Sequence, residues 1–183
     1  RNAQLEPDKT GWNFYLCVRK DVRVGKGGEY LAVLLQDASG QVAGRAFDGV
    51  DRLLPLVDIL IASSDLPERL TGLADHQLAL VELNRKYGCD IVGVTLGETG
   101  SLLYANGQFV RSDGFAVPGG CKDTTGAGDS FRVGLLFGLL SNYDLERSAE
   151  LANAVAALKC RAVGARTALP IREELLEFEK KKS

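Results

Sequence analysis

Hydrophobic and polar residues alternate along the first fifty positions of the chain. Three runs show the period of two that is typical of β-strands, at residues 14–18, 30–36 and 41–47. Glycine-bearing turns separate these runs at residues 25–28 and 37–40. Because short turns join consecutive strands in antiparallel order, this segment is predicted to form a three-stranded β-meander.

From residue 53 onward the pattern changes to strands that alternate with helices. Buried strands are predicted at residues 57–62 and 91–96, and a hairpin is predicted to turn at Asn106-Gly107. The expected helices are residues 66–70, 75–87, 129–140, 144–161 and 172–181. This alternation predicts an α/β fold in which helices flank a parallel sheet. The expected domains are therefore residues 1–52 and 53–183.

The composition narrows the functions to consider. The formal net charge is −2, so the whole chain gives no electrostatic reason to bind nucleic acid or an anionic membrane. No apolar run approaches the roughly 20 residues of a membrane helix. The four cysteines lack a C-x-x-C pair, which favours reduced thiols and a cytoplasmic location. A zinc-type site is not expected, because the chain has a single histidine.

The segment Asp123-Thr-Thr-Gly-Ala-Gly-Asp129 carries the clearest chemical signal. Its small residues, Gly126, Ala127 and Gly128, can bring main-chain N–H groups close to an anion. A predicted helix begins just after them and adds roughly half a positive charge at its N-terminus. Asp129 could take a proton from a substrate hydroxyl. An anion-holding bend beside a carboxylate is suited to phosphoryl transfer, whereas the alternative reading is a tight turn with a helix N-cap.

The predicted topology places this bend near a second loop. In sheets of this class, ligands bind beyond the carboxyl ends of the parallel strands. Thr95 lies at such an end, and the bend follows the last extended segment. The placement agrees with binding of a nucleotide.

The bend resembles the C-terminal signature of the ribokinase-like (PfkB) carbohydrate kinases, and the resemblance extends over residues 53–178. Residues 94–100 resemble the strand and Thr-x-Gly-x-x-Gly nucleotide loop of that family, and residues 151–157 resemble its adenine-pocket helix. The resemblance implies an ATP-dependent carbohydrate kinase, with ATP and Mg²⁺ as cofactors and a sugar or nucleoside-like acceptor.

The same resemblance implies a role for each matching residue. Asp129 would be the catalytic base, and the amides of Gly126, Ala127 and Gly128 would form the anion hole. ATP would be contacted by Thr95, Gly97, Gly100 and Asn153. A potassium-type ion would be held by Asp123 and Thr125, near the loop that Gly164 closes.

The chain departs from the family pattern in two respects. Ser63 and Leu66 stand where the family has the Asn and Glu of its magnesium-bound phosphate network, with Asp65 and Glu68 nearby. The N-terminal half of the family, with its sugar-binding residues and lid, has no counterpart in the sequence. The acceptor would then be unspecified, and a homo-oligomer or a partner chain could complete the fold.

Residues 12–51 show a separate resemblance to the OB-fold nucleic-acid-binding module of bacterial 3′–5′ exoribonucleases. Basic residues and aromatic residues lie in the pattern that suits single-stranded nucleic acid. These residues are Arg19, Lys20, Arg23, Lys26, Tyr15, Tyr30 and Phe47. A plain β-meander with a core of aromatic residues is an equal alternative. Two other functions therefore stay open beside the kinase: a single-strand-binding module, and a chimeric or remnant protein without activity.

Overall fold

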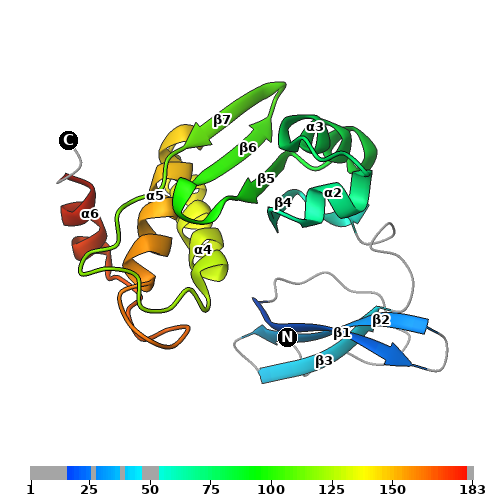
Figure 1. Cartoon of the computed structure of the whole chain (residues 1–183), viewed down its shortest axis with the longest axis horizontal. Coiled ribbons are helices and arrows are strands. Elements are labelled where there is room, and N and C mark those ends of the chain that lie inside the picture. Colours follow the sequence, from blue (N-terminus) through cyan, green and yellow to red (C-terminus); the bar gives the residue numbers. More distant parts are fainter. Residues whose placement is uncertain (1–15, 26–27, 38–39, 47–53, 181–183) are drawn as a thin grey trace. The chain divides into compact units, whose positions relative to one another are not determined.

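A computed structural model describes residues 16–25, 28–37, 40–46 and 54–180 of the chain. The chain divides into two compact units, Arg1–Leu54 and Pro55–Ser183. Each unit has its own sheet (Figure 1). In the described residues, no helix is both long and apolar enough to cross a membrane.

The first unit contains an antiparallel sheet in the order β1-β2-β3. Its strands are β1 (Leu16–Gly25), β2 (Gly28–Asp37) and β3 (Gly40–Ala46). The meander predicted from the alternating pattern is thus confirmed, with a longer first strand and an irregularity in register between Cys17 and Arg19. Tyr15, Lys26 and Phe47, which contribute to the OB-like pattern, lie outside the described residues.

The second unit contains a four-stranded sheet in the order β4-β5-β6-β7. The strands are β4 (Ile59–Ser63), β5 (Ile91–Thr95), β6 (Ser101–Ala105) and β7 (Gln108–Ser112). β4 and β5 are parallel, whereas β6 and β7 pair in antiparallel fashion, so the sheet is mixed. The predicted hairpin is present, and both Asn106 and Gly107 have the positive φ of a two-residue hairpin turn.

Helices surround this sheet as the sequence pattern predicts. They are α2 (Leu66–Thr71), α3 (His76–Tyr87), α4 (Ala127–Leu140), α5 (Leu145–Lys159) and α6 (Arg172–Lys180), with short 3₁₀ turns at Leu54–Leu56 and Gly97–Thr99. Carboxylates begin two of them: Asp75 accepts from the N–H of Leu78, and Asp144 accepts from the N–H of Arg147. Such N-caps satisfy amides that the helix itself leaves without a partner.

The two faces of the sheet are covered by different helices. Ile61 and Leu103 share one core cluster with Phe131 and Leu135 of α4 and with Ala152 of α5. Because side chains alternate along a strand, the neighbouring positions of β5 and β6 face the other side, where α3 packs. Figure 1 shows α4 and α5 side by side, with α2 and α3 at the β4 end of the sheet.

Helices α4 and α5 approach each other closely because glycines line their contact. A Cβ atom added at Gly134 would lie 2.7 Å from the Cα atom of Ala152. One added at Gly138 would lie 2.6 Å from the hydroxyl of Ser148. Protein interiors are packed too densely to absorb such contacts without movement of the backbone. The position of the N-terminus of α4 is therefore set by glycine-mediated packing along its length.

We predict opposite effects on stability for two glycine-to-alanine changes in α4. Alanine favours a helix by roughly 1 kcal/mol over glycine, but the overpacking at Gly134 should outweigh this gain and destabilise the protein by about 1–3 kcal/mol. At Gly128, the nearest atom to an added Cβ is Arg132 Nη1 at 3.6 Å, so Gly128→Ala should be neutral or stabilising. Urea unfolding measures both free energies. Equal stability of the two variants would contradict the packing argument.

Candidate functional site

The carboxyl ends of β4 and β5 meet at one edge of the sheet. Ser63 and Thr95, the last residues of these strands, are directly paired. The Thr95 hydroxyl donates to the main-chain oxygen of Ala62 at 3.3 Å. Beyond Thr95 the chain turns through Gly97–Thr99 into β6. This edge is where the topology predicts a ligand.

Glycine is required on both sides of this turn. Gly100 has a φ of 98°, and a Cβ atom there would overlap the main-chain oxygen of Ser112. A Cβ atom at Gly114 would overlap the main-chain oxygen of Glu98. The turn after β5 is therefore pressed against the chain that leaves β7, and no larger residue fits at either contact.

The Asp123–Asp129 bend leads directly into α4. Gly126 is the N-cap residue with a φ of 80°, a left-handed conformation that glycine adopts without strain. The amide of Ala127 donates to the Thr124 carbonyl at 3.0 Å. Within the described part of the chain, the N–H groups of Gly128 and Asp129 find no main-chain acceptor. They are the free donors of a helix N-terminus, where the helix dipole also favours an anion.

The Asp123 carboxylate fixes the start of this bend. Oδ1 accepts from the N–H of Thr125 at 2.8 Å, and Oδ2 accepts from the N–H of Gly164 at 2.7 Å. These two bonds join the bend to the loop that follows α5. Because they stabilise the ionised form, chiefly through Gly164 and then Thr125, the pKa of Asp123 falls from 3.8 to about 2.

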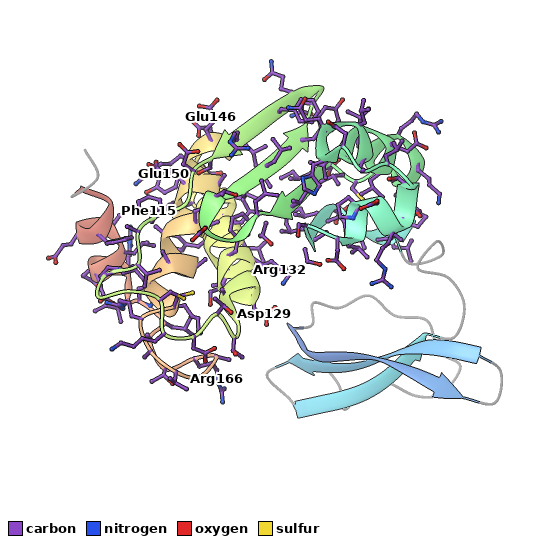
Figure 2. The ribbon with its side chains drawn as sticks, in the orientation of Figure 1. Phe115, Asp129, Arg132, Glu146, Glu150 and Arg166 are labelled. Atoms are coloured by element: carbon purple, nitrogen blue, oxygen red, sulfur yellow. The ribbon has the colours of Figure 1, made fainter. Side chains whose placement is uncertain are left out.

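Asp129 lies in the first turn of α4 with its carboxylate 71% exposed. Its Oδ1 accepts from Arg132 Nη1 at 2.9 Å, and Figure 2 shows the two residues on the same side of α4. Arg132 Nη2 also donates to the main-chain oxygen of Ile61 in β4, at 3.0 Å. The arginine thus connects the carboxylate to the sheet. An exposed ion pair of this kind adds little to stability, so its main effect is to orient the carboxylate.

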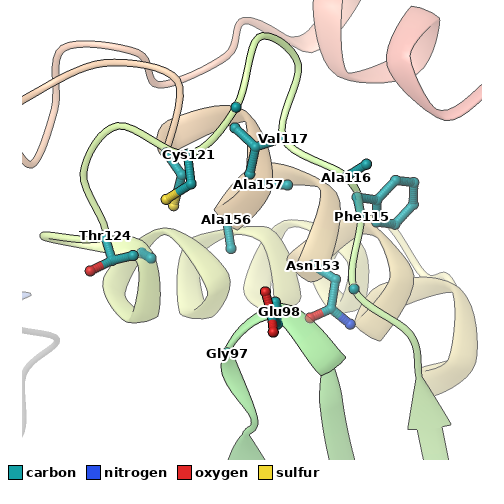
Figure 3. Close-up of a pocket in the computed structure, with 14 residues that line it drawn as sticks. Gly97, Glu98, Phe115, Ala116, Val117, Cys121, Thr124, Asn153, Ala156 and Ala157 are labelled. Atoms are coloured by element: carbon teal, nitrogen blue, oxygen red, sulfur yellow. The ribbon is translucent and has the colours of Figure 1, made fainter.

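A pocket of about 710 Å³ opens beside the bend (Figure 3). Its walls come from the turn after β5, the segment after β7, the bend itself and α5. The lining residues are Gly97, Glu98, Gly114, Phe115, Ala116, Val117, Gly120, Cys121, Thr124, Ala127, Asn153, Ala156, Ala157 and Cys160. The volume lies within the roughly 300–1,000 Å³ that is usual for small-molecule sites.

Asn153 presents an acceptor to this pocket. Its side-chain nitrogen donates to the Ser101 hydroxyl at 3.0 Å and to the main-chain oxygen of Ser112 at 3.2 Å. Because a main-chain oxygen can only accept, the bond to Ser112 fixes the nitrogen on that side. The amide oxygen points away from it, on the side nearer Glu98 (Figure 3). A donor on a bound ligand would match this oxygen.

The structure brings the sequence-predicted residues into one region but not into one cavity. Gly97, Ala127 and Asn153 line the pocket. Gly126, Gly128 and Asp129 belong to the bend that continues from Ala127, and Asp123 and Thr125 hold its start. Thr95 and Gly100 are not among the lining residues and stand at the two ends of the turn after β5.

The sequence motifs did not predict the apolar pocket wall at Phe115 or the contact of Arg132 with Asp129. Phe115 lines the pocket, and its ring lies 5.3 Å from the ring of Phe178 in α6. Neither residue belongs to a motif, so their meeting depends on the tertiary fold. Arg132 was detectable in principle, because a residue three positions after Asp129 shares its helix face.

Ser63 and Asp65 interact with each other at the strand edge. The Ser63 hydroxyl donates to Asp65 Oδ1 at 2.6 Å, and Arg69 lies 3.8 Å from the other oxygen of Asp65. Among the described residues, no group of three or more His, Cys, Asp or Glu side chains gathers as a metal site. The protein residues here do not by themselves form a cage for a divalent ion.

An α/β unit with unpaired amides at a helix N-terminus, close to the carboxyl edge of its sheet, is an arrangement in which many nucleotide-binding proteins hold phosphates. A comparison with protein families matches residues 25–172 to the pfkB family of carbohydrate kinases. The chain belongs to this family. The match begins within the first unit, at the last residue of β1, and so includes β2 and β3.

Individual relatives agree with this assignment. The chain is 33% identical to a ribokinase of Haemophilus influenzae over 150 residues, covering 80% of this chain and 46% of the relative. It is 39% identical to an aminoimidazole riboside kinase of Salmonella typhimurium over 136 residues, covering 70% and 41%. The chain thus spans somewhat less than half the length of these relatives.

Solved structures show the same fold. The Salmonella enterica aminoimidazole riboside kinase, complexed with aminoimidazole riboside and an ATP analogue, superposes with a TM-score of 0.63 at 35% identity, over 72% of this chain and 46% of that structure. The Vibrio cholerae fructokinase, bound to fructose, ADP and calcium, gives 0.63 at 32% identity, over 70% and 43%. The expected ribokinase-like α/β fold is therefore confirmed.

We predict that the Asp123 bonds make stability depend on pH in the acid range. Because the folded-state pKa of about 2 lies below the ordinary 3.8, the stabilisation is complete above pH 4 and is lost as pH falls toward 2. Asp123→Asn removes this contribution. Urea unfolding from pH 7 to pH 2 should show a gap between wild type and variant that narrows only below pH 4. A gap that is constant across this range would contradict the assignment.

Proposed function

We propose that this chain forms the nucleotide-binding and catalytic half of an ATP-dependent kinase. The γ-phosphoryl group of ATP would pass to a hydroxyl on a sugar or nucleoside-like molecule. The observation that carries the proposal is the juxtaposition of unpaired amides at the N-terminus of α4, the Asp129 carboxylate and the adjoining pocket.

The pocket suits the base and ribose of ATP. Its walls are largely small or apolar, with Phe115, Val117 and Ala156 among them, and such walls favour a planar ring. Asn153 would offer its amide oxygen to an exocyclic amine. Gly97 is open at its Cα, so the turn after β5 allows close approach of the nucleotide. In this proposal Thr95 and Gly100 act by shaping that turn.

The bend suits the phosphates. Pocket and bend share Thr124 and Ala127, so a ligand that fills the pocket extends toward the amides of Gly126 and Gly128. Those amides and the dipole of α4 supply positive potential where charge accumulates on the transferring group. The donors are held in place before the reaction, because Gly126 is packed against Ala165 and Asp123 is tied to Gly164.

Asp129 supplies the proton acceptor in this mechanism. Its carboxylate is exposed to an incoming substrate, and Arg132 holds one of its oxygens. The other oxygen is available to accept the proton of the acceptor hydroxyl as that oxygen attacks phosphorus. General-base assistance is typically worth about 10² to 10⁴ in rate.

ATP would bring its magnesium ion with it. Mg²⁺ is usually held by substrate phosphates, waters and one or two carboxylates rather than by a protein cage, which agrees with the absence of a three-ligand cluster in the described residues. Asp65 is the carboxylate nearest the positions of Ser63 and Leu66 and could contact the ion through water. A potassium-type ion near Asp123 and the Thr125 carbonyl would be added to this arrangement and would not be its support, because both carboxylate oxygens already accept one N–H each.

The acceptor is proposed only as a class. The relatives are named as ribokinase, fructokinase and aminoimidazole riboside kinase, which share a ribose-like or ketose-like substrate with free hydroxyls. Because the chain spans less than half of their length, a further polypeptide segment or a second copy could contribute the contacts that choose among acceptors. Nucleotide binding is therefore the first property to test.

We predict that ATP protects Cys121 from alkylation. This thiol is exposed and lines the pocket, whereas Cys160 beside it is buried. Iodoacetamide labelling, followed by mass spectrometry of the Cys121 peptide, should slow as ATP and Mg²⁺ are added. The variant Gly126→Val should abolish the protection of Cys121 by ATP. Gly126 has a positive φ, and Ala165 lies 3.0 Å from an added Cβ, so valine would distort the bend.

The control variant for this experiment is Gly107→Val, which also replaces a positive-φ glycine but lies in the β6–β7 turn, at the end of β6 opposite the turn after β5. It should keep ATP protection wherever it remains folded. Labelling of Cys121 that is unaffected by ATP in the wild type would overturn the nucleotide assignment.

Replacing Asp129 by Asn should separate binding from transfer. We expect ATP to protect Cys121 as in the wild type, while ADP formation in the presence of a panel of sugars and nucleosides falls by about 10² to 10⁴. Asp90→Asn changes another exposed carboxylate, next to the opposite end of β5, and should leave both properties intact. Undiminished turnover by Asp129→Asn would remove Asp129 from the mechanism.

A further inference from the structure

Lys159 is a fully buried lysine at the last position of α5. Its side chain has 0% relative exposure, which is rare for lysine unless its ammonium has a partner. The partner is the main-chain oxygen of Asp123, which accepts from Lys159 Nζ at 2.7 Å. This distance is in the range of charge-assisted hydrogen bonds, which are the stronger ones. The mechanism proposed above assigns no role to Lys159.

Cys160, the residue after Lys159, also bonds to the main chain around Asp123. The main-chain oxygen of Cys160 accepts from the N–H of Lys122 at 2.9 Å and from the N–H of Asp123 at 3.4 Å. Two consecutive residues at the end of α5 therefore hold the main chain of Asp123: Cys160 accepts from its N–H, and Lys159 donates to its carbonyl. These contacts hold the first residue of the bend, three positions before Gly126.

The Asp123 side chain connects this fixed main chain to the next part of the bend and to the loop that contains Gly164. With its main chain fixed, its carboxylate holds the amides of Thr125 and Gly164. Lys159 also belongs to the charges that lower the pKa of Asp123, after the Gly164 and Thr125 hydrogen bonds. The ammonium thus favours the ionised carboxylate on which both hydrogen bonds depend.

Burying an ammonium has a cost that a purely packing role does not explain. Moving such an ion out of water carries an effective penalty of several kcal/mol, and an apolar side chain of similar volume often serves stability better. A neutral donor would also satisfy the Asp123 carbonyl. What lysine adds at this point is a fixed positive charge at the base of a loop that is proposed to hold phosphates.

We propose that Lys159 is a built-in cation that positions the anion-holding bend and strengthens its hold on a polyphosphate. Its ammonium fixes the main chain of Asp123, and the carboxylate of Asp123 fixes Thr125 and Gly164. The amides of Gly126 and Gly128 are thereby held in position. The ligand part of this inference rests on the proposed function. The role of Lys159 in positioning the bend does not rest on it. This role implies that the hydrogen bonds of the bend form without any added monovalent ion.

Amide hydrogen exchange tests the positioning role without a ligand. In Lys159→Met, a variant of similar length without charge, the amides of Thr125 and Gly164 should exchange about tenfold faster or more. The Leu78 amide, held by Asp75 in α3, should keep its rate. Lys159→Arg should restore slow exchange at both sites, because it keeps a charged donor. Unchanged exchange at Thr125 and Gly164 in Lys159→Met would overturn the proposal, as would equal acceleration at Leu78.

A measurement on the unmodified protein covers the case in which Lys159→Met does not fold. Exchange at Thr125 and Gly164 is compared in potassium chloride and in tetramethylammonium chloride, whose cation is too large for a carbonyl site. Equal rates are expected, since Lys159 supplies the charge. Exchange that becomes fast when potassium is removed would show that an external ion holds the bend and would refute a built-in one.

The polyphosphate role is tested by comparing ATP with adenosine in calorimetric titrations. Lys159→Met should weaken ATP binding by about tenfold or more and adenosine binding by less than about twofold, because only ATP reaches the bend. Equal weakening of both ligands would mean that Lys159 supports the pocket as a whole, which overturns this part. If the wild type binds neither ligand, the proposed function fails, and the exchange experiments still decide the positioning role.

Discussion

The Asp123 carboxylate is the interaction on which the site depends. It joins two loops that are distant in sequence, one before α4 and one after α5, through the amides of Thr125 and Gly164. Without that bridge, the bend would lose its direct side-chain link to the loop that contains Gly164. The low pKa of this carboxylate follows from the same bonds, so its charge is present throughout the physiological pH range.

The scaffold behind this bridge is the pair α4 and α5. The glycines of α4 allow α5 to lie close. At the end of α5, Lys159 and Cys160 bond to the main chain of Lys122 and Asp123. A shift of one helix against the other would therefore move the carboxylate relative to the amides it holds. The geometry of the site therefore depends on the packing of α4 against α5. Small residues at this contact, such as Gly134 and Ala152, allow the close approach that the site requires.

Local sequence rules account for much of the second unit. The caps at Asp75 and Asp144 and the Asn106-Gly107 turn each lie where their chemistry predicts, whereas α4 begins at Ala127, two residues before the predicted start at 129. The mixed character of the sheet was harder to anticipate, because strand alternation with helices favours parallel pairing and the hairpin after β5 reverses the direction. The family match from residue 25 likewise begins inside the segment that the alternating pattern assigns to a separate domain.

The parts of the site that the sequence did not reveal come from tertiary contacts. Arg132 reaches back to Ile61 across 71 positions, and Lys159 reaches Asp123 across 36. Phe115 belongs to no motif and enters the pocket wall because the chain after β7 passes over the turn after β5. Motifs identify residues that act through a local backbone shape, whereas residues that support them from elsewhere in the chain need the fold.

A crystal structure of the chain with a non-hydrolysable ATP analogue and Mg²⁺ would show whether the bend holds the phosphates of a nucleotide. Oxygens of the terminal phosphates should lie within hydrogen-bonding distance of the amides of Gly126 and Gly128, with the base between Phe115 and Asn153. A nucleotide bound elsewhere, or a bend whose amides remain solvated while the analogue occupies the pocket, would contradict this proposal.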